Sequence, residues 1–206
     1  METPQSIREF WFGPQVDAPA TVIDDGVIAA AQAKLWWSKS ADVDASIRSR
    51  FAAMLARAAA GQLADWQATP HGRLALILLC DQFPRNMYRD TPQAFACDAL
   101  ARSLCKDGIA RGDDMQLRPI ERVFFYLPLE HSEMMDDQNQ AVHQFKKLVA
   151  DAGASQAATL DGYLQFAYRH REIVARFGRF PHRNTILGRA SSDEETVFLT
   201  QPGSSF

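Results

Sequence analysis

Residues 69–83 read TPHGRLALILLCDQF, and this stretch decides the fold. Thr69 supplies a side-chain oxygen that can cap a helix, and Pro70 follows at the first helical position, where its missing N–H costs nothing. The apolar run from Leu74 to Cys80 leaves the predicted helix, residues 70–83, without a polar face. A helix of that kind has to be covered on all sides, so we expect it to be buried among other elements.

Helix signals also dominate on both sides of this stretch. Threonine–proline pairs recur at residues 3–4 and 91–92, and a capping box at residues 192–195 begins a short helix that continues to Leu199. Amphipathic patterns predict further helices at residues 25–37, 43–60, 92–106, 119–127, 130–150 and 156–177. The alternating runs that are typical of strands are nearly absent. The sequence therefore predicts an all-α array of about eight to ten antiparallel helices.

The composition and charge exclude several classes of protein. Of the 206 residues, 47% are hydrophobic and 23% are charged, which is typical of a globular protein and not of a disordered one. The 22 Lys and Arg residues nearly balance the 25 Asp and Glu residues, whereas a dedicated nucleic-acid-binding domain is usually strongly basic. We therefore expect no nucleic-acid partner.

Membrane and secretion signals are also missing from the sequence. The run from Leu74 to Cys80 is too short to span a bilayer, and the opening stretch METPQSIREFWFG has no secretory pattern. The three cysteines, Cys80, Cys97 and Cys105, form no Cys-x-x-Cys pair and cannot all pair internally. Because no linker or change of composition divides the chain, we expect a single cytoplasmic domain, residues 1–206, without a membrane partner.

One short motif occurs twice. The sequences are FPRN at residues 83–86 and FPHRN at residues 180–184. In each, the proline is expected to end a helix, and polar donors follow at once. The motif is either a reused helix stop, whose basic groups satisfy the last helical carbonyls, or part of a shared binding edge.

Titratable residues occupy positions where helical periodicity places buried side chains. His170 lies in the middle of the apolar stripe of the predicted helix 156–177, and Glu130 and His131 lie within or beside the stripe of the preceding helix. Asp81 directly follows the long apolar run. Burying an unpaired charge costs several kcal/mol, so these groups need partners or shifted pKa values.

Two interpretations of these buried groups are open. In the first, they form a polar pocket in which Asp81 or Glu130 orients a histidine, His170 or His131, as a general base, and nearby arginines bind an anion. In the second, they form a satisfied core network that fixes how the helices pack.

A metal site is a weaker interpretation. Its ligands would be the acidic and imidazole side chains Glu130, Glu133, Asp137, His170 and His182. The Glu-x-x-His spacing of di-iron bundles and the His-Glu-x-x-His spacing of zinc proteases are both missing. The sequence also lacks a GxSxG nucleophile elbow, a P-loop and a GxGxxG loop. We therefore expect no metal and no cofactor.

Several longer motifs resemble those of a known family. They read FWFG at residues 10–13, TPHGR at 69–73, DQFPRNMYR at 81–89, FFYLPLEHSE at 124–133 and RFGRFPHRN at 176–184. From about Phe10 to Glu195 the chain is similar to a widespread, chiefly bacterial family, domain of unknown function number nine hundred and twenty-four. The resemblance implies a tetratricopeptide-like superhelix with degenerate repeats. It brings no established activity, cofactor or catalytic residues.

Two functions and a purely structural role are the alternatives. The first function is a binding module that holds a small anionic ligand or a peptide terminus with the polar side chains Arg85, Asn86, Arg179, His182, Arg183 and Asn184. The second is a small hydrolase-like enzyme that uses the histidine–carboxylate pair described above.

A common site makes a geometric demand on the fold. It requires at least three of the segments that hold Asp81, Glu130 with His131, His170 and residues 181–184 to meet. Because it lies just beyond a proline, Arg183 is expected to be held less tightly than a core side chain. The oligomeric state is left open.

Overall fold

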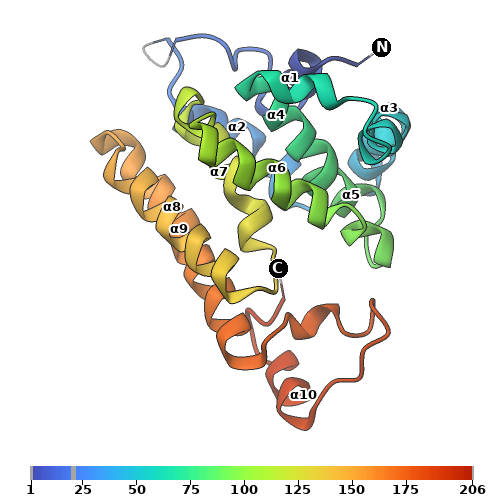
Figure 1. Ribbon diagram of the computed structural model, residues 1–206. Helices are drawn as coiled ribbons and strands as arrows, with labels where there is room; N and C mark the ends of the chain where they lie inside the picture. The colour runs from blue at the N-terminus through green and yellow to red at the C-terminus, as the bar shows by residue number, and fades with distance from the viewer. Residues whose placement is uncertain (1, 20–21, 206) are drawn as a thin grey trace.

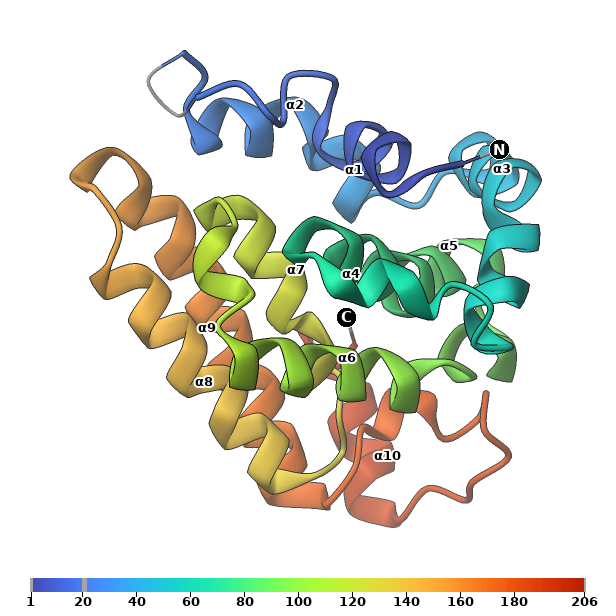
Figure 2. The ribbon, with the colours of Figure 1, turned by 45° about the horizontal axis from the view of Figure 1, so that its top comes forward.

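Helix α4, Pro70–Ile77, lies at the centre of the molecule, packed against helices α1, α6 and α7 (Figure 2). The structure is a computed structural model that describes residues 2–19 and 22–205 (Figure 1). The Gly72 N–H donates to Thr69 Oγ1 at 3.1 Å, which confirms the predicted cap. A Cβ on Gly72 would lie 2.1 Å from the Trp66 carbonyl oxygen, so this position needs glycine. The residues from Gly72 to Ile77 are all buried, as the missing polar face predicts.

The other elements of the described residues are also helical, and none of those residues forms a strand, which confirms the all-α prediction. The α-helices are α1 Pro4–Phe12, α2 Asp25–Trp37, α3 Ala41–Ala59, α5 Phe83–Met87, α6 Asp98–Arg111, α7 Pro119–Glu130, α8 Met135–Ala150, α9 Ala154–Phe177 and α10 Asp193–Leu199. The short elements are the 3₁₀ turns η1 Ala64–Ala68, η3 Pro92–Phe95, η4 Asp114–Gln116 and η5 Pro181–Arg183, together with the π-turn η2 Leu78–Gln82.

The prediction that Pro84 ends a helix is wrong. After α4 the chain widens into the π-turn η2, in which the Phe83 N–H bonds to the Leu78 carbonyl, five residues back. The chain then continues as α5, and Pro84 occupies the first turn of that helix. A backbone N–H is not needed at that position, so the π-turn accommodates the proline without a break.

Three other helix boundaries differ from the prediction. Helix α7 continues through Pro128 to Glu130 because every residue from Ile120 to Glu130 is buried, and tertiary packing outweighs the hydrogen bond that the proline removes. The predicted helix 130–150 begins only at α8, after a turn in which the Met134 N–H donates to Ser132 Oγ at 3.2 Å. The predicted helix 92–106 divides into η3 and α6, and the Thr91 hydroxyl donates to Tyr88 O instead of capping.

Aromatic rings gather in one part of the main core, around Phe124. Phe124 of α7 contacts the rings of Trp11, Phe12, Trp36 and Trp37, and its centroid lies 4.6 Å from that of Trp36. These ring contacts pack α1, α2 and α7 together. A second, much smaller cluster contains the buried residues Ile173, Val174 and Phe180.

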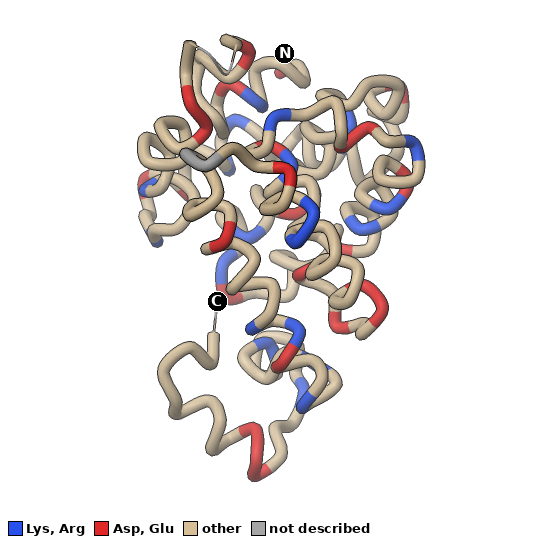
Figure 3. Tube along the Cα trace, turned by 90° about the vertical axis from the view of Figure 1, so that its left-hand side faces the viewer, with Lys and Arg blue, Asp and Glu red and all other residues tan. Residues whose placement is uncertain are grey.

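Residues 178–203, which we call the C-terminal segment, include η5 and α10 and follow α9. In Figure 1 they lie at the bottom of the molecule, away from helices α1 to α3. In the view of Figure 3, basic and acidic residues are interspersed along the trace. Within the described residues, no helix has the length and apolarity that crossing a membrane requires.

Candidate functional site

Three segments that are far apart in the sequence meet at the C-terminal end of α7. Asp81 Oδ1 lies 2.8 Å from His131 Nδ1, and Glu130 Oε1 lies 3.1 Å from His170 Nδ1. Arg183 Nη1 donates to the His131 carbonyl at 3.0 Å. The expected convergence is therefore confirmed: η2, the end of α7, α9 and η5 contribute to one polar cluster, which we call the α7-end network.

The π-turn places the Asp81 carboxylate inside the core. Asp81 is fully buried, and it accepts a hydrogen bond from Gln82 Nε2 at 2.6 Å. Arg85 Nη1 lies 3.4 Å from Asp81 Oδ1 and donates to the Asp81 carbonyl at 2.8 Å. Burial alone raises the pKa of this carboxyl, but the neighbouring Arg85 and His131 bring the pKa well below its usual range. Asp81 is therefore a permanent buried anion.

Asp81 also sets the protonation of His131. Burial and the nearby Arg85 lower the pKa of His131, so its ring is neutral at pH 7. An ionised carboxylate only accepts hydrogen bonds, so Nδ1 of His131 carries the proton and donates it to Asp81. Nε2 then bears the lone pair. This is the tautomer and orientation that a histidine base requires.

Glu130 is neutral at pH 7. It is buried, and burial together with the Asp81 charge raises its pKa to about 8. Burial and the neighbouring His131 lower the pKa of His170 to about 3, so His170 is also uncharged. His170 Nδ1 donates to Phe166 O at 2.9 Å and lies 3.1 Å from Glu130 Oε1. Because Oε1 faces that donor, the Glu130 proton resides on Oε2.

Arg183 is held tightly, which corrects the expectation of a loosely held side chain. It is 7% exposed and lies between two aromatic rings, with its guanidinium carbon 4.8 Å from the Phe95 centroid and 4.5 Å from that of Phe180. Both contacts are cation–π interactions between the guanidinium and a ring face. The nearest carboxylate oxygen in its ion pairs, Asp98 Oδ2, is 3.9 Å away. Burial and Arg85 lower the pKa of Arg183 to about 10.

The other predicted binding residues lie outside this cluster or at its margin. Arg179 Nε donates to Glu195 Oε1 at 2.6 Å, and Asn184 Nδ2 donates to Glu195 Oε2 at 3.3 Å. Asn86 Nδ2 donates to Asp44 at 3.0 Å, on another face of α5. His182 lies against Phe180, with ring centroids 5.6 Å apart, and burial lowers its pKa to about 4. Of the six predicted side chains, Arg85 and Arg183 reach the α7-end network directly.

The sequence did not identify two acidic residues, Asp98 and Glu133, as parts of this site. Asp98 accepts both arms of the Arg85 fork, at 2.9 and 3.1 Å, but the predicted helix 92–106 gave it no special position. Glu133 accepts from the Phe180 N–H at 2.8 Å and from both Nη atoms of Arg189, at 2.7 and 2.9 Å. Sequence reasoning considered Glu133 only as a metal ligand. Among the described side chains, no group of three or more His, Cys, Asp or Glu residues is arranged to hold a metal.

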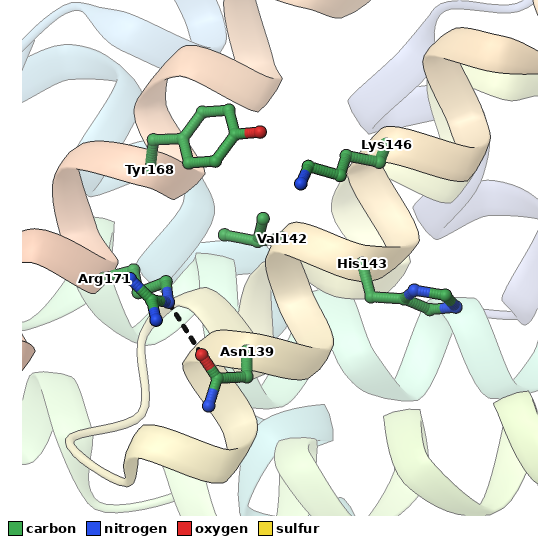
Figure 4. A pocket seen from close by; sticks show the side chains of 6 residues that line it. All are labelled: Asn139, Val142, His143, Lys146, Tyr168 and Arg171. Atoms are coloured by element: carbon green, nitrogen blue, oxygen red, sulfur yellow. Dashed lines mark hydrogen bonds between the residues drawn. The ribbon is translucent and has the colours of Figure 1, made fainter.

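Two surface hollows lie elsewhere. One, of about 360 Å³, is lined by residues of α8 and α9, with Lys146 and Tyr168 facing each other and His143 directed away (Figure 4). Another, of about 430 Å³, is lined by Arg169, Glu172, Ile173, Phe198, Pro202 and Gly203. Neither of them is lined by a residue of the α7-end network.

Comparison with known proteins identifies a family but no activity. The model of a family described as bacterial protein of unknown function, DUF924, matches residues 7–203. The chain is 40% identical to a protein of unknown function from Agrobacterium tumefaciens, ATU0120, whose solved structure aligns with a TM-score of 0.74 over 89% of this chain and 98% of that one. No curated protein matches the chain. The chain therefore belongs to the DUF924 family of bacterial proteins.

Proposed function

We propose that the protein binds a small ligand through a carboxylate or phosphate group, between Arg183 and Glu130. The observation that carries this proposal is that two buried polar atoms of the α7-end network, Arg183 Nε and Glu130 Oε2, each have no hydrogen-bond partner among the described residues. Both are donors near neutral pH, since the guanidinium always carries its hydrogens and the pKa of Glu130 is raised to about 8. Leaving a buried donor unsatisfied costs about 1–3 kcal/mol, and an anionic oxygen is its natural partner.

The charges around His131 support the same ligand chemistry. Asp81 is already compensated by Arg85 and by the hydrogen bond from His131, and Asp98 is held by the Arg85 fork. Arg183 is the cation with the weakest compensation in the cluster, because its acceptor at hydrogen-bond distance is the neutral carbonyl of His131. A buried guanidinium in that situation favours a planar anion that can accept from its fork.

Access to this site requires the C-terminal segment to move. Arg183 and Phe180 belong to that segment, and they cover the end of α7. The segment is held to the turn before α8 by polar contacts, chiefly those of Glu133 with Arg189 and the Phe180 N–H, and to α9 by the small cluster of Ile173, Val174 and Phe180. The polar contacts can be exchanged for water at modest cost, so we expect the ligand to enter when the segment opens.

The test is ligand-dependent thermal unfolding at pH 6.5. The probes are inorganic phosphate, succinate and a short acetylated peptide with a free C-terminus. The matched variants are Arg183→Lys, which keeps the charge but loses the fork, and Arg176→Lys, which alters an exposed arginine paired with Glu194. We expect one class of probe to stabilise the wild type by about 2.7 kcal/mol at 100 times its dissociation constant. Arg176→Lys should respond equally, and Arg183→Lys should lose most of the shift. An equal response of Arg183→Lys would contradict the proposal.

The protonation of Glu130 gives a second, independent readout. As the pH rises through about 8, Glu130 ionises and becomes a repulsive carboxylate, so the affinity for the anion should fall. Glu130→Gln keeps a donor but cannot ionise, so its affinity should stay level between pH 6.5 and 9. A parallel fall in both proteins would place the ligand away from Glu130.

The hydrolase-like alternative depends on the pair of Asp81 and His131. Their 2.8 Å contact leaves His131 Nε2 with the lone pair, as a general base needs. Hydrolysis of p-nitrophenyl acetate and p-nitrophenyl phosphate by wild type and His131→Gln tests this candidate. Turnover that is lost in His131→Gln would favour the enzyme, and turnover that is absent or equal in both proteins would exclude this pair as its catalyst for these substrates.

A further inference from the structure

A hollow between helices α8 and α9 gathers positive charge that no acid of the hollow balances. Its volume is about 360 Å³, and it is lined by Asn139, Val142, His143, Lys146, Tyr168 and Arg171 (Figure 4). Two of these side chains, Lys146 and Arg171, are cationic, and none is acidic. A hollow of this volume is large enough to hold a small organic ligand.

The protein does not supply a counter-ion for these two cations. Most of the described arginines pair with a carboxylate, as Arg176 does with Glu194 at 2.7 Å. In the part of the chain that the structure describes, neither Lys146 nor Arg171 forms an ion pair. The whole chain carries a net charge of −3, so a surplus of basic residues does not explain this local positive charge. An anionic partner would compensate it.

The two cations are held at opposite ends of the hollow. Arg171 Nε donates to Asn139 Oδ1 at 2.7 Å, and Lys146 Nζ lies 5.4 Å from the centroid of the Tyr168 ring. Asn139 and Lys146 are seven residues apart on α8, which corresponds to about 10 Å along the helix axis. Val142 is buried and lies between the two ends, so the middle of the hollow has an apolar surface (Figure 4).

Both ends of the hollow can donate hydrogen bonds to a ligand. The contact with Asn139 uses Nε of Arg171, and within the described residues its two Nη atoms make no hydrogen bond, so they can form a fork to one carboxylate or phosphate group. The Lys146 ammonium has three N–H groups, and its contact with the Tyr168 ring leaves N–H groups that can donate to an anion. Both contacts restrict long side chains before a ligand arrives, which reduces the entropy lost on binding.

We infer that this hollow binds an extended organic dianion that carries a carboxylate or phosphate group at each end. One anionic group contacts Arg171, the other contacts Lys146, and the apolar chain that joins them lies over Val142. A shorter dianion reaches only one of the cations, and a ligand with a single charge leaves the other cation uncompensated. The hollow is separate from the α7-end network, because the two have no residue in common.

The experiment is isothermal titration calorimetry of the folded protein at pH 7 and low ionic strength. Suberate carries two carboxylates separated by six methylene groups, and 1,6-hexanediol bisphosphate is its counterpart with phosphate ends. Octanoate has the length of suberate but a single charge, and succinate has both charges on a shorter chain. We expect suberate or the bisphosphate to bind at least about 5-fold more tightly than octanoate and succinate, and the tighter of the two identifies the anionic group.

Four variants test the two ends of the hollow. Lys146→Gln and Arg171→Gln each remove one of its cations, and the matched controls Lys147→Gln and Arg169→Gln remove exposed cations that do not line it. Each of the first two should weaken binding of the longer dianion by about 5-fold, and both controls should bind it like wild type. The inference is overturned if octanoate or succinate binds as tightly as the longer dianions, if the controls lose as much affinity, or if neither longer dianion binds.

Arg183→Lys distinguishes this site from the one proposed above. Suberate binding that survives in Arg183→Lys but weakens in Arg171→Gln would support the hollow, whatever the result for the α7-end network. Suberate binding that is lost in Arg183→Lys and kept in Arg171→Gln would place the dianion at the end of α7, which would support the proposed function and overturn this inference.

Discussion

Phe124 and Phe180 are both completely buried phenylalanines, but they are buried in different ways. Phe124 lies among Trp11, Phe12, Trp36 and Trp37, in the core that joins helices α1, α2 and α7. Phe180 lies in a small cluster with Ile173 and Val174, and its ring also contacts two histidine rings and the Arg183 guanidinium. The helical body is thus stabilised by a large apolar core, whereas the C-terminal segment is held by a small apolar cluster together with polar contacts that water can replace. This difference predicts that the core helices expose their backbone amides only by global unfolding, whereas the C-terminal segment exposes its amides by local opening.

Removing the Phe124 ring should have the largest effect. Phe124→Ala should lower the free energy of unfolding by about 3–5 kcal/mol, because it removes a buried ring and leaves a cavity in the main core. Urea denaturation followed by circular dichroism measures this change. The control Phe166→Ala truncates a ring that is 47% exposed and should cost about 0.5 kcal/mol or less. Equal losses in the two variants would mean that the aromatic core does not dominate stability.

The pH dependence of stability should reveal the buried neutral acid. Between the usual pKa of a glutamate and about 8, folded Glu130 keeps a proton that the unfolded chain has lost, so stability falls as the pH rises. From pH 6.5 to 8 the loss is on the order of 2 kcal/mol, at 1.36 kcal/mol per pH unit. His170 and His182 have lowered pKa values of about 3 and 4, so they raise stability with pH only below about 6.5.

Glu130→Gln isolates this effect. When the pH dependence of its free energy of unfolding is subtracted from that of the wild type, the contributions of the other titratable groups cancel. The titratable groups close to Glu130 include His131, the next residue, together with His170 of α9 and Asp81 of η2, and all three are unchanged in the variant. Urea midpoints measured at half-unit steps of pH should fall with rising pH in the wild type. They should fall equally in the control Glu172→Gln, which changes an exposed acid of α9. Parallel curves for wild type and Glu130→Gln would show that Glu130 is ionised in the folded protein.

Loosening the C-terminal segment should have a smaller and local effect. Glu133→Gln removes the charge that holds Arg189 and weakens the bond to the Phe180 N–H, which should lower the opening free energy by about 1.5–3 kcal/mol. The global urea midpoint should hardly change. Trypsin cleavage after Arg189 should be about 10-fold faster or more than in wild type, whereas Asp136→Asn, at an exposed acid in the first turn of α8, should match wild type. Cleavage at the wild-type rate would show that Glu133 does not hold the segment.

The fold was largely predictable because its decisive signals are local. The apolar run after Pro70, the cap at Thr69 and the capping box at residues 192–195 all appear in the structure. The helix boundaries at Pro84 and Pro128 were mispredicted, although either proline would end an isolated helix. A π-turn accommodates Pro84, and the burial of α7 on all sides stabilises the helix through Pro128. The tetratricopeptide-like superhelix stays a prediction.

The candidate site was predictable in part. Helical periodicity placed Asp81, Glu130 and His170 on buried faces, and these positions do converge. The hydrogen-bond partner of each polar side chain depends on long-range packing, which the sequence does not show. Arg179 and Asn184 were therefore assigned to the site, but both donate to Glu195 outside it. The burial of Arg183 depends on Phe95, a contact between segments 88 positions apart that no local pattern encodes.

The central claim is that an anion site at the end of α7 is reached by local opening of the C-terminal segment. Its most direct test is amide hydrogen exchange with and without the probe that stabilises the wild type. The Phe180 and Asn184 amides should exchange at a lower opening free energy than the His131 amide of α7, and the anion should slow them in wild type but not in Arg183→Lys. Exchange of all three amides only by global unfolding, unchanged by the anion, would contradict the account.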